Sequence, residues 1–221
     1  YLRSPLHLAA FAGYTHIVRR LVEDFGCEIE DLQKNDPEMQ LVHMAARTGS
    51  IDVMRYLIEE MPEVGGRKRP SILSSGGVCV IFSTVVLDKL DAFLYCLDKV
   101  PGLDPRRQSD MMQGVIEGSG SETADLASTL LDDYKYPLYW STIGYGATRI
   151  FRWMLDNNFD KGLNAKKPVA KREFLTAARY GSIEIMKLLR SRGFDIQADM
   201  TALAHKNPLS VAVNYEHLEL L

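Results

Sequence analysis

Two histidines in this 221-residue chain occupy positions that repeat. His7 and His43 lie 36 residues apart, and each precedes a pair of alanines in an apolar segment. Imidazole nitrogens can bind a metal or transfer a proton. A metal site needs three or four ligands, however, and no third ligand repeats together with these histidines. The spacing therefore indicates a repeated structural role for both side chains.

Motifs for nucleotide and calcium binding are incomplete. The Gly-Tyr-Gly at 144–146 begins like a dinucleotide loop, but Arg149 stands where the third glycine is needed. The segment 156–160 begins like a calcium loop, but Gly162 comes one place late and Lys167 replaces the required bidentate glutamate. Because hydrolase, P-loop and zinc-protease motifs are also missing, we predict no catalytic residue, no cofactor site and no metal site.

The cysteines are three in number, which is too few and odd for a disulfide framework. Cys79 and Cys96 stand at apolar positions, and Cys27 follows a glycine that would end a helix. We interpret all three as small buried hydrophobic side chains. A reactive thiol at one of them is the alternative.

Composition and charge narrow the class of protein. The chain is 46% hydrophobic and 25% charged, which is typical of a globular fold and excludes a disordered one. The formal net charge of −3 gives no basic excess for nucleic acid. The longest apolar run, 78–87, is about half the ~20 residues of a membrane span. The absence of glycosylation acceptors favours an intracellular protein, and we expect it in the cytoplasm rather than the nucleus.

Two basic stretches lie at 67–69 and at 161–172. We interpret each as a solvated loop. A surface for an acidic partner, a nuclear import signal and anion binding are the alternatives.

A sequence unit recurs along the chain at a spacing of about 36 residues. It consists of a Pro-Leu or His start, a pair of small residues, a glycine and then two apolar pairs, one helical turn apart. Five copies are recognisable, and they begin near 4–13, 42–49, 137–146, 176–181 and 208–212.

Each part of the unit has a physical role. Ser4 suits a helix N-cap, and Pro5 suits the first helical position, where its missing N–H costs nothing. The Ala9–Ala10 pair allows two helices to approach closely. Gly13 and its counterparts can end the first helix. The second helix is expected to end at residues that tolerate the left-handed conformation, namely Gly26, Asn158 and Gly193.

This unit resembles the ankyrin repeat, whose signature is a Thr-Pro-Leu-His-x-Ala start and a period of about 33 residues. The resemblance implies an all-α solenoid of stacked helix-turn-helix units with short β-hairpin fingers. It also implies that His7 and His43 form hydrogen bonds with the backbone between neighbouring units.

The repeats predict one array over 1–221 with about seven units, irregular at 65–137. In this irregular part the first helix would lie near 78–87, and a further helix pair would lie at 111–117 and 124–131. Both ends of the chain adjoin repeat sequence without a polar capping unit, so we expect it to be part of a longer protein.

The predicted function is a non-enzymatic protein-interaction scaffold that binds another protein through its concave groove. A regulatory or targeting segment of a larger enzyme, receptor or effector is the alternative. We expect neither nucleic acid nor a membrane span to be involved, and the oligomeric state is left open.

The resemblance also places two residues per unit, between the small pair and the glycine, on the wall of this groove. Tyr145, Tyr180 and Tyr215 recur at 35-residue intervals, which predicts a ladder of rings. The alternative is that these rings pack between units. The predicted partner-binding residues are Phe11, Arg47, Thr48, Tyr145, Arg179, Tyr180, Asn214 and Tyr215.

Overall fold

The structure is a computed structural model that describes residues 4–27, 41–62, 80–100, 136–159 and 173–193. These residues form helices and turns, with no strand among them. The predicted hairpin fingers, the helix pair at 111–117 and 124–131, and the repeat that begins near 208 lie outside the described residues.

The chain divides into two compact units, residues 1–100 and residues 101–221. A single array over 1–221 stays a prediction.

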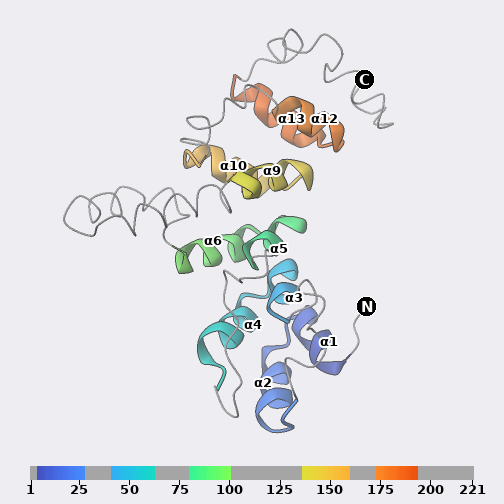
Figure 1. The fold of residues 1–221 in the computed structure, drawn as a ribbon, viewed down its shortest axis with the longest axis vertical. Helices are drawn as coiled ribbons and strands as arrows, with labels where there is room; N and C mark the ends of the chain where they lie inside the picture. The colour runs from blue at the N-terminus through green and yellow to red at the C-terminus, as the bar shows by residue number, and fades with distance from the viewer. Residues whose placement is uncertain (1–3, 28–40, 63–79, 101–135, 160–172, 194–221) are drawn as a thin grey trace, which may run out of the picture. The chain divides into compact units, whose positions relative to one another are not determined.

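The first compact unit contains three described helix pairs. The helices that begin the pairs lie next to one another, with α3 packed against both α1 and α5, and α4 lies beside both α2 and α6 (Figure 1). The second helix of the middle pair continues from α4 into a π-helical turn, η2. The elements are α1 (Pro5–Ala12), α2 (Thr15–Glu23), α3 (Leu41–Thr48), α4 (Ile51–Arg55), η2 (Tyr56–Glu60), α5 (Val80–Val86) and α6 (Leu90–Lys99).

The second compact unit contains two described helix pairs of the same kind. The first helices α9 and α12 pack together, and the second helices α10 and α13 pack together. The elements are α9 (Tyr136–Gly144), α10 (Thr148–Asp156), α12 (Glu173–Arg179) and α13 (Ile183–Ser191).

One turn joins the two helices of all five described pairs. In the middle pair, the N–H of Gly49 donates to the carbonyl of Ala46 at 3.2 Å, and the N–H of Ser50 donates to that of Ala45 at 2.8 Å. This is the Schellman arrangement, which needs one residue with positive φ. In the five turns, in chain order, the residue with positive φ is Gly13, Gly49, Asp88, Gly146 and Gly181, and its φ lies between 52° and 82°.

The structure confirms the predicted ends of the helices. Ser4 caps α1 by accepting a hydrogen bond from the N–H of His7, and Pro5 is the first helical residue. Positive φ values at Gly26, Asn158 and Gly193 end α2, α10 and α13. Asp88 was not predicted as a turn residue, because residues other than glycine rarely adopt positive φ.

Successive turns fit closely over one another within each compact unit. A Cβ atom on Gly49 would lie 3.1 Å from Cδ of Lys89, and one on Gly13 would lie 2.9 Å from Oγ of Ser50. In the second compact unit, Ser182 donates a hydrogen bond from its hydroxyl to the carbonyl of Ile143 at 2.8 Å. The glycines therefore provide space for the neighbouring turn as well as the left-handed conformation.

The two residues before each described turn are buried, and three of these five pairs are the two alanines that the repeat predicts. Ala45 and Ala46 are completely inaccessible to solvent. In the two less regular helix pairs, the first residue of this buried pair is a threonine, and its hydroxyl donates a hydrogen bond to a carbonyl of the same helix. Thr84 donates to the carbonyl of Ile81, and Thr142 donates to that of Tyr139, both at 2.6 Å. These bonds satisfy a polar group in the core, so threonine can replace alanine there.

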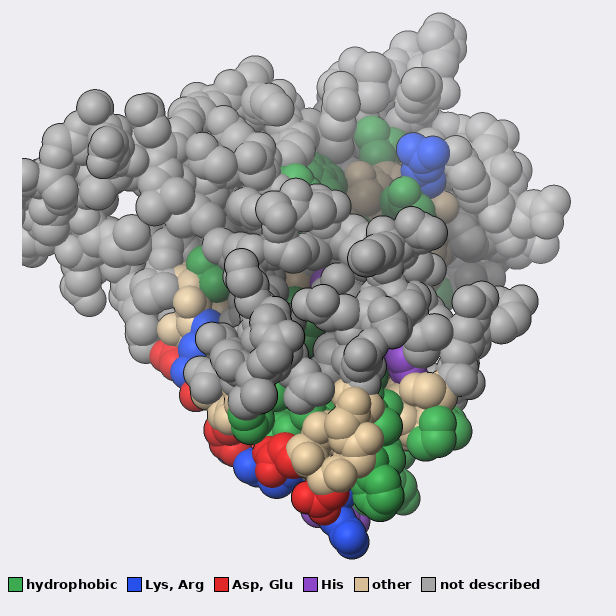
Figure 2. Space-filling model, turned by 60° about the horizontal axis from the view of Figure 1, so that its bottom comes forward, with side chains coloured by type: hydrophobic (Ala, Val, Ile, Leu, Met, Phe, Trp, Pro, Cys, Tyr) green, Lys and Arg blue, Asp and Glu red, His purple; other side chains and the backbone are tan. Residues whose placement is uncertain are grey.

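The first helix pair carries an uncovered apolar area. Ile17 is 38% exposed, although its counterparts Val53, Ile150 and Ile185 are fully buried. Figure 2 shows hydrophobic side chains on the visible surface, beside acidic and basic side chains. The exposed large hydrophobic residues of α1, α2 and their flanking turns are Leu8, Phe11, Tyr14, Ile17 and Phe25.

Ion pairs join the second helices of neighbouring pairs. In the first compact unit, Arg19 of α2 pairs with Glu60, and Lys99 of α6 pairs with Glu59 at 3.0 Å. The hydroxyl of Tyr95 also donates to Glu59, and this hydrogen bond, followed by that of Lys99, lowers the pKa of the Glu59 carboxyl. Because these groups are largely exposed, each pair contributes about 1 kcal/mol or less.

The close fit of the turns can be tested at Gly49. We expect Gly49→Ala to lower the free energy of unfolding by about 2 kcal/mol, because the Cβ atom adds contact with Lys89 to the strain of positive φ. Gly26→Ala is the matched control, since its φ is also positive but no atom lies within 4 Å of the added Cβ. It should cost about 1 kcal/mol. Chemical denaturation followed by circular dichroism measures both, and equal losses would contradict the contribution of the contact.

Candidate functional site

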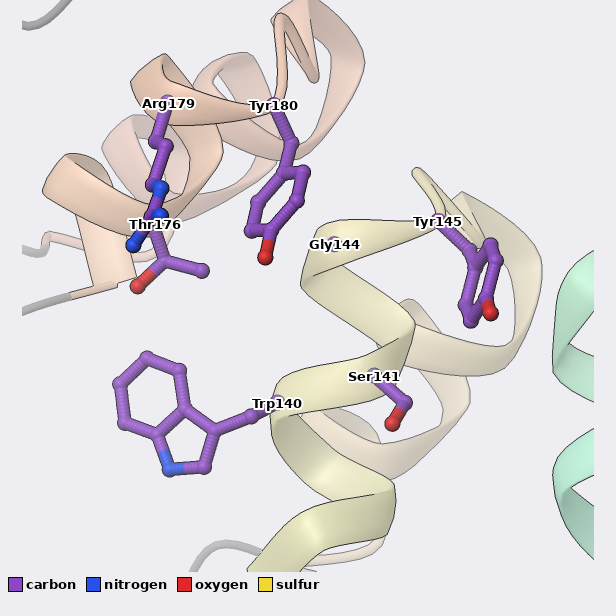
Figure 3. Close-up of a pocket in the computed structure, with 7 residues that line it drawn as sticks. All are labelled: Trp140, Ser141, Gly144, Tyr145, Thr176, Arg179 and Tyr180. Atoms are coloured by element: carbon purple, nitrogen blue, oxygen red, sulfur yellow. The ribbon is translucent and has the colours of Figure 1, made fainter.

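An open cleft lies between α9 and α12 in the second compact unit. It has a volume of about 560 Å³. In Figure 3, four side chains surround one open space, with one ring from α9 on one side and three side chains from α12 on the other. The described residues that line the cleft are Trp140, Ser141, Gly144, Tyr145, Thr176, Arg179 and Tyr180.

The wall formed by α9 is built on Trp140 and Gly144, which lie one helical turn apart on the same face. The ring of Trp140 packs edge-on against Tyr139, with the ring centroids 5.6 Å apart. Tyr139 is itself buried and contacts Phe151 of α10 at a centroid distance of 5.3 Å. The hydrophobic core of the helix pair therefore supports the indole that faces the cleft.

The wall formed by α12 presents Thr176, Arg179 and Tyr180. Thr176 and Tyr180 lie four residues apart, so both face α9. The Arg179 guanidinium lies over the ring of Tyr180, 5.8 Å from its centroid. The opposite face of α12 is held by Ala177 and Ala178, which are fully buried. The exposed side chains of this wall thus stand on a packed helix.

Gly144 leaves room for the ring of Tyr180. A Cβ atom on Gly144 would lie 3.6 Å from Cε2 of that ring, which is ordinary van der Waals contact. A side chain longer than alanine would occupy the space of the ring itself. Gly144 is helical, so its role is to allow this close approach rather than an unusual backbone angle.

The lining of the cleft offers groups that can bind a ligand. Its lining offers aromatic surface, one guanidinium and two small hydroxyls, and none of these described residues is an acid, a histidine or a cysteine. In the described parts of the chain, no three His, Cys, Asp or Glu side chains are grouped so that they could hold a metal ion.

The predicted residues of the groove have different environments. Tyr145 and Tyr180 are 60% and 55% exposed, and both line the cleft. Phe11 and Arg47 are also exposed. The side chain of Thr48 is half-buried, and its hydroxyl donates to the carbonyls of its own helix. Asn214 and Tyr215 lie outside the described residues.

The two tyrosines do not point into the same space. Tyr180 faces Trp140 across the cleft, whereas Tyr145 and Ser141 point away from that space on the other side of α9 (Figure 3). The alternative prediction was that the tyrosine rings pack between units. It applies in part to Tyr180, because the ring of Tyr180 lies against Gly144 of the preceding helix pair. More than half of that side chain is nevertheless exposed.

Trp140 and Thr176 were not among the predicted groove residues. Each lies four residues before a residue that was assigned to the groove, Gly144 or Tyr180. The helical period alone would place them on the same face. Trp140 also occupies the position that His7 and His43 hold in their units, counted back from the turn glycine.

The two repeated histidines are buried, and Nδ1 of each lies within hydrogen-bond distance of a serine hydroxyl. Nδ1 of His7 lies 2.7 Å from Oγ of Ser4, within its own helix pair. Nδ1 of His43 lies 2.9 Å from Oγ of Ser83, which belongs to the next pair. Burial lowers the pKa of His43 to about 4, so the imidazole is neutral at pH 7.

The two described cysteines do not line the cleft. Cys96 is fully buried in α6, and Cys27 is half-buried after the end of α2. Cys79 and the basic stretches at 67–69 and 161–172 lie outside the described residues.

Comparison with known proteins identifies the repeat. Residues 2–68 match a family model described as ankyrin repeats in three copies. This segment, about a third of the chain, is therefore similar to ankyrin repeats. A similar solved structure is the ankyrin repeat domain of human ASB11, with 16% sequence identity and a TM-score of 0.48, covering 88% of this chain and 71% of that one. No curated protein sequence matches the chain.

The described helix pairs beyond residue 68 have the same turn and a buried pair of residues before it, as those inside the matched segment do, although only Ala177 and Ala178 keep the two alanines. Ankyrin repeats generally act in protein–protein interaction and are typically non-catalytic. Within the described ranges, each helix is too short or too polar to cross a membrane.

The state of His43 gives a pH prediction. Its pKa in the folded chain lies below the ordinary value of 6.5, so protonation favours the unfolded chain. The stability that the neutral imidazole contributes is present above pH 6.5 and is lost as the pH falls towards 4. Between about pH 7.5 and about pH 5 this one group should lower the free energy of unfolding by about 2 kcal/mol.

The variant His43→Gln tests that assignment, because it removes the titrating group at the same position. Its free energy of unfolding should depend less on pH than that of the parent chain over this interval. His16→Gln is the control, since His16 is exposed. Denaturation curves at several pH values provide the comparison. Parallel pH profiles for the parent chain and His43→Gln would show that His43 is not the group responsible.

Proposed function

We propose that this chain is a scaffold that binds a partner protein through the exposed side chains of its first helices. In the second compact unit, the cleft between α9 and α12 is the anchoring site. The observation that carries the proposal is the exposure of two aromatic side chains, Tyr145 and Tyr180, at equivalent positions of successive helix pairs. The general role of ankyrin repeats supports it.

Aromatic side chains of this kind are effective anchors for a protein partner. Tyrosine, tryptophan and arginine are enriched among the residues that contribute most to protein–protein binding. Trp140, Arg179 and Tyr180 provide all three types in one cleft. A tyrosine also loses little conformational entropy on binding, because it has only two side-chain torsions.

The cleft is held in place before a partner arrives. Trp140 is supported by the buried Tyr139, and α12 is fixed by its buried Ala177 and Ala178. Tyr139 also donates a hydrogen bond to the carboxylate of Glu173 at 3.5 Å, which links α9 directly to α12. Such preorganisation reduces the entropy that is lost on association.

The test begins with the identification of partners by affinity purification and mass spectrometry, followed by calorimetric titration with a purified partner. The double variant Tyr145→Ala and Tyr180→Ala should weaken binding by about 2 kcal/mol or more. Its thermal stability should fall little, since exposed substitutions usually stay within about 0.5 kcal/mol each. Tyr14→Ala is the control, because Tyr14 is 54% exposed but lies in the first compact unit.

A second pair of variants tests the cleft without removing a ring. Gly144→Leu places side-chain atoms where the ring of Tyr180 lies, so partner binding should fall at least tenfold. Gly144→Ala fits the same space, so it should bind normally and should be more stable by about 1 kcal/mol, the helical preference for alanine over glycine. Normal binding by both Gly144→Leu and the double tyrosine variant would refute the proposed anchoring site.

A further inference from the structure

We propose that two copies of this chain associate about a two-fold axis through the outer face of the first helix pair. The outer face is the side of α1 and α2 that is turned away from α3 and α4. Its described residues are Leu8, Tyr14, Ile17, Arg20, Leu21 and Asp24. This inference goes beyond the proposed function, because the cleft belongs to the second compact unit.

The turns identify the residues of a helix pair that face the pair before it. The residue after the left-handed glycine has this position in two described places. Oγ of Ser50 lies 2.9 Å from the point that a Cβ atom on Gly13 would occupy. Ser182 donates its hydrogen bond to the carbonyl of Ile143 in the preceding pair. Tyr14 is the counterpart of these two serines, so it marks the outer face of the first pair.

The helical period adds Ile17 and Leu21 to this face, because they lie three and seven residues after Tyr14. Ile17 is 38% exposed and Leu21 is half-buried. The same positions are covered in the pairs whose preceding pair is described. The counterparts of Leu21 there are completely inaccessible to solvent, and they are Leu57, Cys96 and Leu189. The outer face therefore has the residues of a contact between helix pairs but lacks the covering pair.

The helix α1 extends the same apolar surface. Leu8 is 51% exposed, whereas its counterpart Met44 in α3 is 8% exposed. No aspartate, glutamate, lysine or arginine occurs in α1. Among the described residues, five of the eight exposed large hydrophobic side chains belong to the first helix pair and its flanking turns. Exposed apolar surface that is concentrated in this way marks an interaction surface.

Two charged side chains lie beside this apolar surface on α2. Arg20 lies three residues after Ile17, and Asp24 lies three residues after Leu21, so both belong to the same helix face. Nε of Arg20 is 3.2 Å from Oδ2 of Asp24, and the two side chains are 71% and 56% exposed. Along the outer face the basic residue therefore comes first and the acidic residue follows one turn later.

This order of charges makes the outer face complementary to itself. About a two-fold axis perpendicular to α2 and close to Leu21, the α2 helices of the two copies run in opposite directions. Arg20 of each copy then lies beside Asp24 of the other copy, and the apolar side chains of both copies are buried against each other. The four charges alternate in sign, so no like charges meet. Because α1 is uncharged, its two copies also approach without repulsion.

A different protein or a peptide segment is the competing occupant of this face. Such a partner would need an apolar surface together with an acidic and a basic group in the order opposite to Arg20 and Asp24. A second copy of the chain has both features by symmetry. The charge arrangement and the likeness to the contact between stacked helix pairs therefore favour a second copy.

Sedimentation velocity of the full chain measures this association, at chain concentrations from about 1 µM to about 100 µM. We expect the particle mass to rise with concentration from the 24.9 kDa of one chain to twice that value. Ile17→Glu places a carboxylate of each copy in the apolar contact, so the Kd of the dimer should rise about tenfold or more. Leu87→Glu is the matched control, since Leu87 is 51% exposed but belongs to the third helix pair. It should associate like the parent chain.

A charge-reversal series tests the two-fold arrangement itself. Arg20→Glu gives each copy two acidic side chains that face those of the other copy, so the Kd should rise about tenfold or more. The double variant Arg20→Glu and Asp24→Arg reverses the order of the charges and restores complementarity, so its Kd should stay within about threefold of the parent value. Circular dichroism verifies the fold of each variant.

Three results would overturn the inference. A chain that stays monomeric at about 100 µM leaves the outer face to another protein or a peptide segment. A dimer that Ile17→Glu leaves intact is formed through a different surface. A dimer that Ile17→Glu dissociates but Arg20→Glu does not has another orientation at this face, so the two-fold arrangement is wrong. Partner binding at the cleft is a separate measurement, so each of these results leaves the proposed function unaffected.

Discussion

The left-handed turn between the two helices of each unit is the constraint on which the rest of the structure depends. It directs the second helix back along the first, so that both bury their apolar side chains against the neighbouring pair. The two Schellman hydrogen bonds form around Gly49 and, with nearly the same lengths, around Asp88. Each helix ends with satisfied carbonyls and with a fixed change of direction.

The candidate cleft is a consequence of the same turn. Tyr145 and Tyr180 each come directly before the left-handed glycine of their units, at the last turn of a first helix. At that position the preceding buried pair already provides the packing, so the residue directly before the glycine is not needed in the core. It can therefore be large, aromatic and exposed without loss of stability, as a binding surface requires.

Much of this arrangement could be predicted from the sequence, because glycine, proline and paired alanine have strong local preferences. Gly13, Gly146 and Ser4 have the roles that their residue types suggest. Asp88 could not be predicted, since only the burial of its whole helix pair outweighs the local preference against positive φ. The environment of Tyr180 also depends on tertiary structure. Its ring has room only because Gly144, 36 residues earlier in the chain, has no side chain.

The threonines of the less regular units have a consequence for how such a protein changes over evolution. Thr84 and Thr142 replace alanine in the core at no cost in unsatisfied polar atoms, because each hydroxyl bonds to a carbonyl of its own helix. Asp88 likewise replaces a turn glycine while the hydrogen bonds of the turn persist. Substitutions at the characteristic positions of the repeat are therefore tolerated as long as the backbone geometry is kept. A helix pair can keep that geometry after its sequence no longer matches the repeat pattern.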